Sequence, residues 1–158
     1  FDLALRAVTP RGMTDSSMVV RRLADIEIQL FAAPAYLIRR GTPRTPEDTR
    51  EHDWVLFRGG WPTREFGVAE RGRIVGDDFA FVARTLRAGA GIGPLPTFLA
   101  LSYVASGSLV RVLPRHSVLG GRFVMLSPKG HHVPRKVSAF RDFLVDALAA
   151  RSLASRVE

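Results

Sequence analysis

One stretch, residues 76–98 (GDDFAFVARTLRAGAGIGPLPTF), constrains the fold of this chain more than any other. Asp77 or Asp78 can accept hydrogen bonds from the free N–H groups of a helix's first turn. Four apolar residues then recur at helical spacing: Phe79, Val82, Ala83 and Leu86. Gly89 and Gly91 end that helix, because a residue without Cβ adopts the left-handed conformation that the turn needs.

The residues that follow predict a buried strand and a second helix. Residues 92–95 are apolar without alternation, which is typical of a strand covered on both faces. Pro96 and Thr97 break this strand and cap a helix over residues 98–104. The order helix, strand, helix favours a parallel α/β sheet whose ligand cleft lies beyond the strand's carboxyl end.

Periodicity and turn residues predict the remaining elements. Strands are expected over residues 1–6, 18–23, 26–31, 53–57, 72–76, 109–113 and 122–127. Helices are expected over residues 32–41, from Thr45 onward, and over residues 134–150. In the last helix one apolar stripe is predicted: Val137, Phe140, Leu144 and Leu148.

Length and composition limit the class of protein. The 158 residues suffice for one domain with a real core or for two small lobes. The absence of cysteine excludes disulfides, thiolate metal sites and cysteine nucleophiles. No apolar run approaches the roughly 20 residues that cross a bilayer, and no signal peptide is visible, so we expect no membrane partner. The chain opens on Phe1 inside an expected strand, so we expect a fragment that lacks its natural N-terminus.

The net charge of +8 comes from arginines scattered among apolar and acidic residues. A nucleic-acid surface more often shows a clustered basic stripe with interleaved aromatic residues. The distribution therefore favours an arginine-rich, solvated surface over direct DNA contact by this segment.

Three features invite an enzymatic reading, and each is weak. His131 and His132 are adjacent, so they point apart on a strand or turn, and no third metal ligand lies nearby. Ser16, Ser17 and Ser106 lack the pattern of a nucleophile elbow. The glycines of residues 89–93 follow a helix and open a strand, the reverse of a dinucleotide fingerprint. We expect no enzyme, no metal site and no cofactor.

The ordered set of segments resembles the effector-binding domain of LysR-type transcriptional regulators, a bacterial family. The resemblance rests on DLALR at residues 2–6, on residues 15–57 with their PAYL helix, and on GDDFAFVARTLRAGAGIGPLPTFLA at residues 76–100. It continues through GSLVRVLP at residues 107–114 and PRKVSAFRDFLVDAL at residues 134–148. It covers essentially the whole chain.

The resemblance implies an α/β fold of the type II periplasmic-binding-protein-like class, with two lobes and a small-molecule effector held between them. Lobe I would be residues 1–26 and 122–158, incomplete at its N-terminus, and lobe II residues 27–121. The implied protein is a cytoplasmic homodimer or tetramer that binds DNA only through a helix-turn-helix domain absent from this chain. The alternative is a transport-type periplasmic solute-binding protein of similar fold.

Effectors of the resembled family are often small carboxylates or aromatic acids, which helix starts and open-turn N–H groups bind. Candidate contacts lie at the ends of predicted strands: Arg6, Phe57, Arg58, Gly93, Pro94 and Leu95. Arg6 and Arg58 can each grip a carboxylate with two hydrogen bonds, or they can be solvated surface charges. Trp61 is either a wall of the site or a packing residue, and Asp77 is expected to cap a helix.

Overall fold

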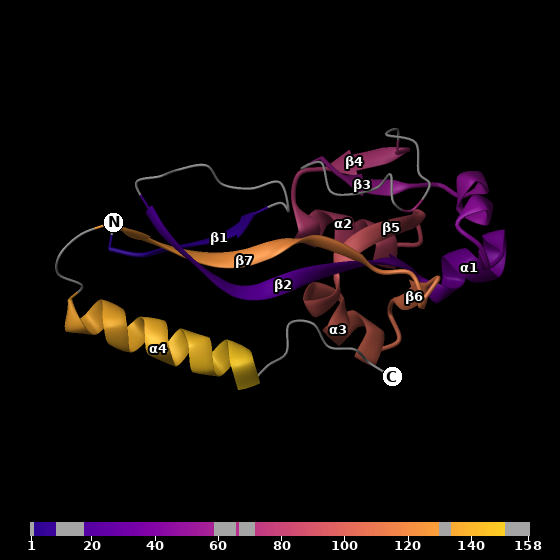
Figure 1. Ribbon diagram of the computed structural model, residues 1–158. Helices are drawn as coiled ribbons and strands as arrows, with labels where there is room; N and C mark the ends of the chain where they lie inside the picture. Colours follow the sequence, from indigo (N-terminus) through magenta and orange to yellow (C-terminus); the bar gives the residue numbers. More distant parts are fainter. Residues whose placement is uncertain (1, 9–17, 59–65, 67–71, 130–133, 151–158) are drawn as a thin grey trace. The chain divides into compact units, whose positions relative to one another are not determined.

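A computed structural model describes residues 2–8, 18–58, 66, 72–129 and 134–150 (Figure 1). The chain divides into two compact units: unit 1 comprises residues 1–26 and 119–158, and unit 2 residues 27–118. The assignment of residues 1–26 and 122–158 to lobe I and of residues 27–121 to lobe II stays a prediction. None of the helices in the described residues is long and apolar enough to cross a membrane.

Unit 1 contains an antiparallel ladder and one long helix. Strand β1 (Ala4–Val8) pairs with β7 (Val118–Pro128), in a register that runs from Ala4 opposite Leu126 to Val8 opposite Arg122. Strand β2 (Met18–Ala32) is the next neighbour of β7 in the sheet. Helix α4 spans Arg135–Ala150.

One prediction in this part of the chain is wrong. The separate strands expected over residues 18–23 and 26–31 form one strand, β2, because no glycine or proline interrupts residues 18–32. The predicted stripe of α4 is not uniformly buried: Val137 is 8% exposed, whereas Phe140 is 47% exposed and the neighbouring Phe143 67%.

Unit 2 holds most of the regular elements. In chain order they are α1 (Pro34–Arg40), the 3₁₀ helix η1 (Glu47–Glu51), β3 (Val55–Phe57), β4 (Ile74–Gly76), α2 (Phe79–Arg87), β5 (Ile92–Pro96), α3 (Thr97–Ala105) and β6 (Val110–Val112). The end of β2 belongs to the same unit.

The strands of unit 2 pair in both senses. Strand β3 pairs with β4 in parallel, and the parallel bridge between Trp54 and Ile92 connects β3 to β5. Strand β2 pairs antiparallel with both β5 and β6. The prediction of a parallel sheet therefore holds for β3, β4 and β5 and is wrong for the neighbours of β2.

Turn chemistry explains most of the boundaries. Pro34 opens α1, and Gly41 ends it at φ +88°, as predicted. Asp78 rather than Asp77 caps α2: its carboxylate accepts a hydrogen bond from Ala80 N–H at 2.9 Å. Of the two predicted caps, Asp78 is confirmed and Asp77 is wrong.

The two glycines after α2 have different roles. Gly89 adopts φ +75° and ends the helix, as predicted. Gly91 instead permits a close approach of β5 to β3, since a Cβ there would lie 2.3 Å from the carbonyl oxygen of Asp53. The core of unit 2 joins the predicted face of α2 to residues of β2, β3, β5 and α3 and to the residue before β6: Phe31, Val55, Val82, Ala83, Leu86, Leu95, Ala100 and Leu109.

Candidate functional site

The strand directions in unit 2 bring the carboxyl ends of β3, β4 and β5 to one end of the sheet, beside the middle of β2. Strands β3 and β4 are parallel and in register, with Phe57 opposite Gly76, and β5 runs parallel to β3. Strand β2 is antiparallel to β5, with Ile28 opposite Pro96. We call this end the carboxyl edge, and it comprises Ile28, Gln29, Phe57, Arg58, Asp77, Asp78, Phe79, Pro96 and Thr97. In α/β sheets ligands bind outside the carboxyl ends of the strands.

Two of the predicted site residues lie at the carboxyl edge. Arg58 is exposed, and its backbone N–H donates to the carbonyl oxygen of Gly76 at 2.7 Å, which fixes the turn after β3. Phe57 is half-buried and its ring stacks on that of Phe79, with centroids 4.0 Å apart and planes 15° apart. The edge therefore combines an exposed guanidinium with an aromatic pair.

Three other predicted site residues, Gly93, Pro94 and Leu95, are buried inside β5. They lie opposite residues 31, 30 and 29 of β2, respectively. The side chain of Leu95 belongs to the core, and a Cβ at Gly93 would lie 2.3 Å from the carbonyl oxygen of Val55. These positions pack the strand closely against its neighbours, and contact with a ligand stays a prediction.

Helix α3 starts at the carboxyl edge without a side-chain cap. The prediction that Thr97 caps this helix is wrong, because its hydroxyl points to β2 and donates to the carbonyl oxygen of Glu27 at 3.4 Å. Pro96, the N-cap residue, has no side-chain acceptor to offer the first N–H groups of α3. A helix start in this condition favours a bound anion.

Gln29 is the residue of this edge that sequence reasoning missed. It is 8% exposed, and its Oε1 atom is buried without a hydrogen-bond partner. The alternation of Ile26, Ile28 and Leu30 indicates a solvent-facing side chain at position 29. The signal that could have corrected this is the continuous apolar run 30–33, which indicates that both faces are covered at this end of β2.

The remaining predicted residues lie elsewhere. Arg6 lies on β1 in unit 1, opposite Val124, with an exposed side chain. Its predicted place at the end of a strand is wrong, because β1 continues to Val8. Trp61, His131 and His132 lie outside the described residues. No group of three or more histidine, aspartate or glutamate side chains within the described ranges could hold a metal ion.

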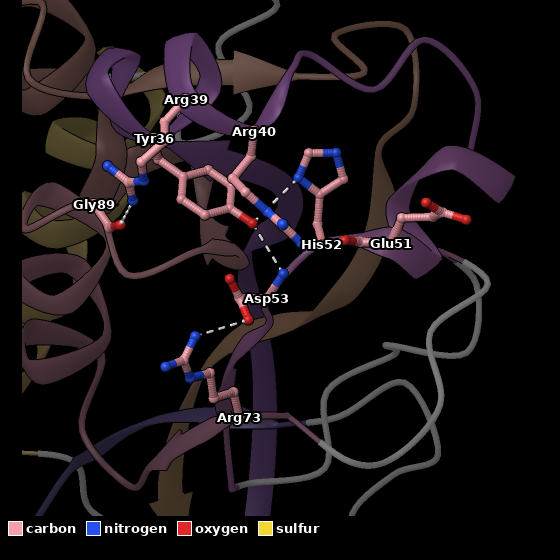
Figure 2. A network of polar contacts seen from close by, with 8 residues as sticks. All are labelled: Tyr36, Arg39, Arg40, Glu51, His52, Asp53, Arg73 and Gly89. Carbon is pink, nitrogen blue, oxygen red and sulfur yellow. Dashed lines mark hydrogen bonds and ion pairs between the residues drawn. The ribbon is translucent and has the colours of Figure 1, made fainter.

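The opposite end of the same strands, which we call the amino edge, carries a network of satisfied polar contacts: Tyr36, Arg39, Arg40, Glu51, His52, Asp53, Arg73 and Gly89 (Figure 2). Its centre is the hydroxyl of Tyr36, a residue only 1% exposed. The hydroxyl oxygen accepts from Asp53 N–H at 2.9 Å and lies 3.2 Å from Nδ1 of His52. Because that oxygen is already accepting, its proton can be donated to the unprotonated Nδ1.

Arginines extend this network to neighbouring segments. Arg39 donates to the carbonyl oxygen of Gly89 after α2, and Arg40 to that of Glu51, each at 2.9 Å. Arg73 forms an ion pair with the carboxylate of Asp53 at 3.0 Å. The network connects α1 to η1, to β3 and to the end of α2.

The surroundings of His52 change the pKa of its imidazole. Burial lowers the pKa of His52 below its ordinary value, and the nearby guanidinium of Arg40 lowers it further. The carboxylates of Asp53, Asp48 and Glu51 oppose that pKa shift without reversing it. The neutral imidazole is thus the form that the folded network favours.

Comparison with known proteins decides the family. The model of the LysR substrate binding domain matches residues 1–149. This chain belongs to the LysR substrate-binding domain family. Its fold is accordingly the α/β, type II periplasmic-binding-protein-like fold of LysR regulatory domains.

Individual relatives agree with this assignment. The chain is 31% identical over 156 residues to the transcriptional regulator PtxR of Pseudomonas aeruginosa, with 93% of this chain and 49% of the relative covered. It is 31% identical over 145 residues to the transcriptional activator AaeR of Escherichia coli, with 85% of this chain and 47% of the relative covered. The chain spans about half the length of the curated relatives it matches.

A solved structure shows the same fold. The regulatory domain of CrgA, a LysR-type regulator from Neisseria meningitidis, superposes with a TM-score of 0.79 at 24% identity. The superposition covers 93% of this chain and 75% of that domain. At this identity the similarity establishes the fold alone.

Proposed function

We propose that the chain is the effector-sensing part of a LysR-type transcriptional regulator and that its effector is a small anionic or aromatic molecule. The observation that carries the proposal is the carboxyl edge of unit 2, where the uncapped start of α3 lies among the ends of three parallel strands. Such a start binds anions through its N–H groups. The aromatic pair Phe57 and Phe79 supplies an apolar surface beside it.

Arg58 and Arg6 are the residues that we propose to bind a carboxylate of the effector. Arg58 lies at the carboxyl edge with an exposed guanidinium, and Arg6 is exposed on β1 of unit 1. A guanidinium holds a carboxylate with two parallel hydrogen bonds. Binding by these arginines and by Gly93, Pro94 and Leu95 is proposed on the sequence prediction that they end strands. In the structure Arg6 lies in the middle of β1, and Gly93, Pro94 and Leu95 lie buried inside β5.

The test is a thermal-shift screen of the whole protein against small carboxylates and aromatic acids, with the parent, Arg58→Ala and Arg6→Ala. A ligand at one hundred times its dissociation constant stabilises the native state by about 2.7 kcal/mol. We expect at least one acid to raise the melting temperature of the parent and the arginine variants to lose most of that response. Arg84→Ala, on an exposed turn of α2, is the control and should keep it. If no acid stabilises the parent, the proposal fails.

The proposal also includes the macromolecular partners of the protein. A sensing domain of this family would act within a cytoplasmic homodimer or tetramer that reaches DNA through a helix-turn-helix domain, without enzymatic activity of its own. The alternative of a transport-type solute-binding protein predicts a monomer. Sedimentation equilibrium of the whole protein distinguishes them, and the similarity to transcriptional regulators favours the oligomer.

A further inference from the structure

Gln29 is a buried polar side chain with an unmet hydrogen bond. It lies opposite Leu95, one pair inside the last pair of the β2–β5 ladder, Ile28 with Pro96. Paired residues and residues two apart in a strand share a face, so Gln29 lies on the same face as Leu95 and Phe31. Both of those side chains belong to the apolar core of unit 2. A glutamine at the end of a core face is costly unless something satisfies it.

The unmet group is an acceptor. Oε1 is buried without a partner, whereas buried polar atoms in native proteins usually have one. Leaving a buried acceptor unsatisfied costs the full desolvation of that group. A ligand that donates to Oε1 removes this cost, and such a differential contact is what favours the liganded arrangement over the free one.

We infer that Gln29 determines effector specificity by accepting a hydrogen bond from a hydroxyl or amino group of the effector. The inference rests on the proposed function, since it places the effector at the carboxyl edge. The uncapped start of α3, which follows Pro96 directly, holds the carboxylate, and Gln29 on the adjoining strand holds the donor. The ligand class is therefore a small carboxylic acid that carries a hydroxyl or amino group.

The experiment uses the whole protein and pairs of small acids that differ by one hydroxyl: lactate with propionate, malate with succinate, and mandelate with phenylacetate. Dissociation constants are measured by calorimetry for the parent and for Gln29→Met, which keeps the shape of the side chain and removes the acceptor. We expect the parent to prefer the hydroxy acid of at least one pair about tenfold. Gln29→Met should bind both members of that pair equally.

The melting temperature without ligand gives a second readout. Replacing an unsatisfied buried acceptor with an apolar group should leave the melting temperature of Gln29→Met equal to the parent's or higher. The matched control is Thr49→Val, because Thr49 is fully buried and its hydroxyl donates to the carbonyl oxygen of Pro46. That variant should melt lower than the parent and keep the preference for the hydroxy acid.

The outcomes separate this inference from the proposed function. If acids bind but no pair shows a hydroxyl preference, or if the preference survives in Gln29→Met, the role of Gln29 is refuted and the effector site stands. A drop in melting temperature for Gln29→Met as large as that of Thr49→Val also refutes it, because Gln29 would then be structural. If no acid binds the parent, the proposed function and this inference fail together.

Discussion

The two edges of the parallel strands in unit 2 differ in how completely their polar groups are satisfied. At the amino edge the hydroxyl of Tyr36, the N–H of Asp53 and the guanidinium of Arg39 all have partners within 2.9 Å (Figure 2). At the carboxyl edge the Oε1 atom of Gln29 has no partner and α3 starts without a side-chain cap.

This difference indicates that the two edges have different roles. Hydrogen bonds that are already made stabilise the native state and leave nothing for a ligand to gain. Groups left without partners cost stability in the free protein and offer that free energy to a ligand. We therefore expect the amino edge to stabilise the fold, and we propose the carboxyl edge as the binding end.

The largest test of this contrast is Gly91→Ala at the amino edge. The new Cβ would lie 2.3 Å from the carbonyl oxygen of Asp53, so β5 and β3 must move apart. We expect a loss of about 3 kcal/mol in the free energy of unfolding, measured by urea denaturation. Gly107→Ala is the control: it has φ +69° and open space around it, so it should lose about 1 kcal/mol from backbone strain alone. Equal losses would contradict a packing role for Gly91.

A smaller effect is expected for Tyr36→Phe. The ring stays buried, but Asp53 N–H loses its acceptor and His52 loses its partner. We expect the free energy of unfolding to fall by about 2 kcal/mol, with the affinity for any effector unchanged. Tyr103→Phe is the control, because phenylalanine keeps the ring under the guanidinium of Arg87, and it should change stability little. An altered effector affinity in Tyr36→Phe would show that the amino edge is not purely structural.

Local chemistry made most of unit 2 predictable. The face of α2 with Val82, Ala83 and Leu86 was correct, because its spacing belongs to one helix. The ends of α1 and α2 were correct because Gly41 and Gly89 end these helices with a positive φ, which glycine adopts readily. Each of these features depends on residues close together in the sequence.

The errors arise where distant segments decide the outcome. Threonine is a common helix cap, yet the hydroxyl of Thr97 donates to the carbonyl oxygen of Glu27, which is far away in the sequence. Gly91 was interpreted as a helix stop, although its role depends on the approach of Asp53. Gln29 alternates with apolar residues like a solvent-facing side chain, and only the covering of β2 on both faces buries it.

The same limit applies to the candidate site. Arg58 is predicted as a site residue because it directly follows a predicted strand; the registers of β3, β4 and β5 put it at the carboxyl edge, and its contact with a ligand stays a prediction. The amino edge was not foreseen, because Tyr36, His52 and Arg73 come from three separate segments. A sequence pattern within one segment does not predict contacts between separate segments.

The smallest predicted effect is a pH dependence that belongs to the amino edge. The pKa of His52 is lower in the folded protein than its ordinary value of 6.5, because of burial and Arg40. As the pH falls, the unfolded chain therefore binds the proton first, and the free energy of unfolding decreases. The contribution is complete above the ordinary pKa and is lost as the pH falls through the pKa of the folded protein. Since the imidazole is partly solvated, we expect a shallow slope.

This slope is measured by urea denaturation of the parent and of His52→Gln between about pH 7.5 and pH 5. Glutamine offers an acceptor to the hydroxyl of Tyr36 and does not titrate in this range. The variant should be less sensitive to acid than the parent, while the two profiles run parallel at the alkaline end. Identical slopes would mean that protonation of His52 leaves the contact with Tyr36 intact. The neutral imidazole would then add nothing to the free energy of unfolding.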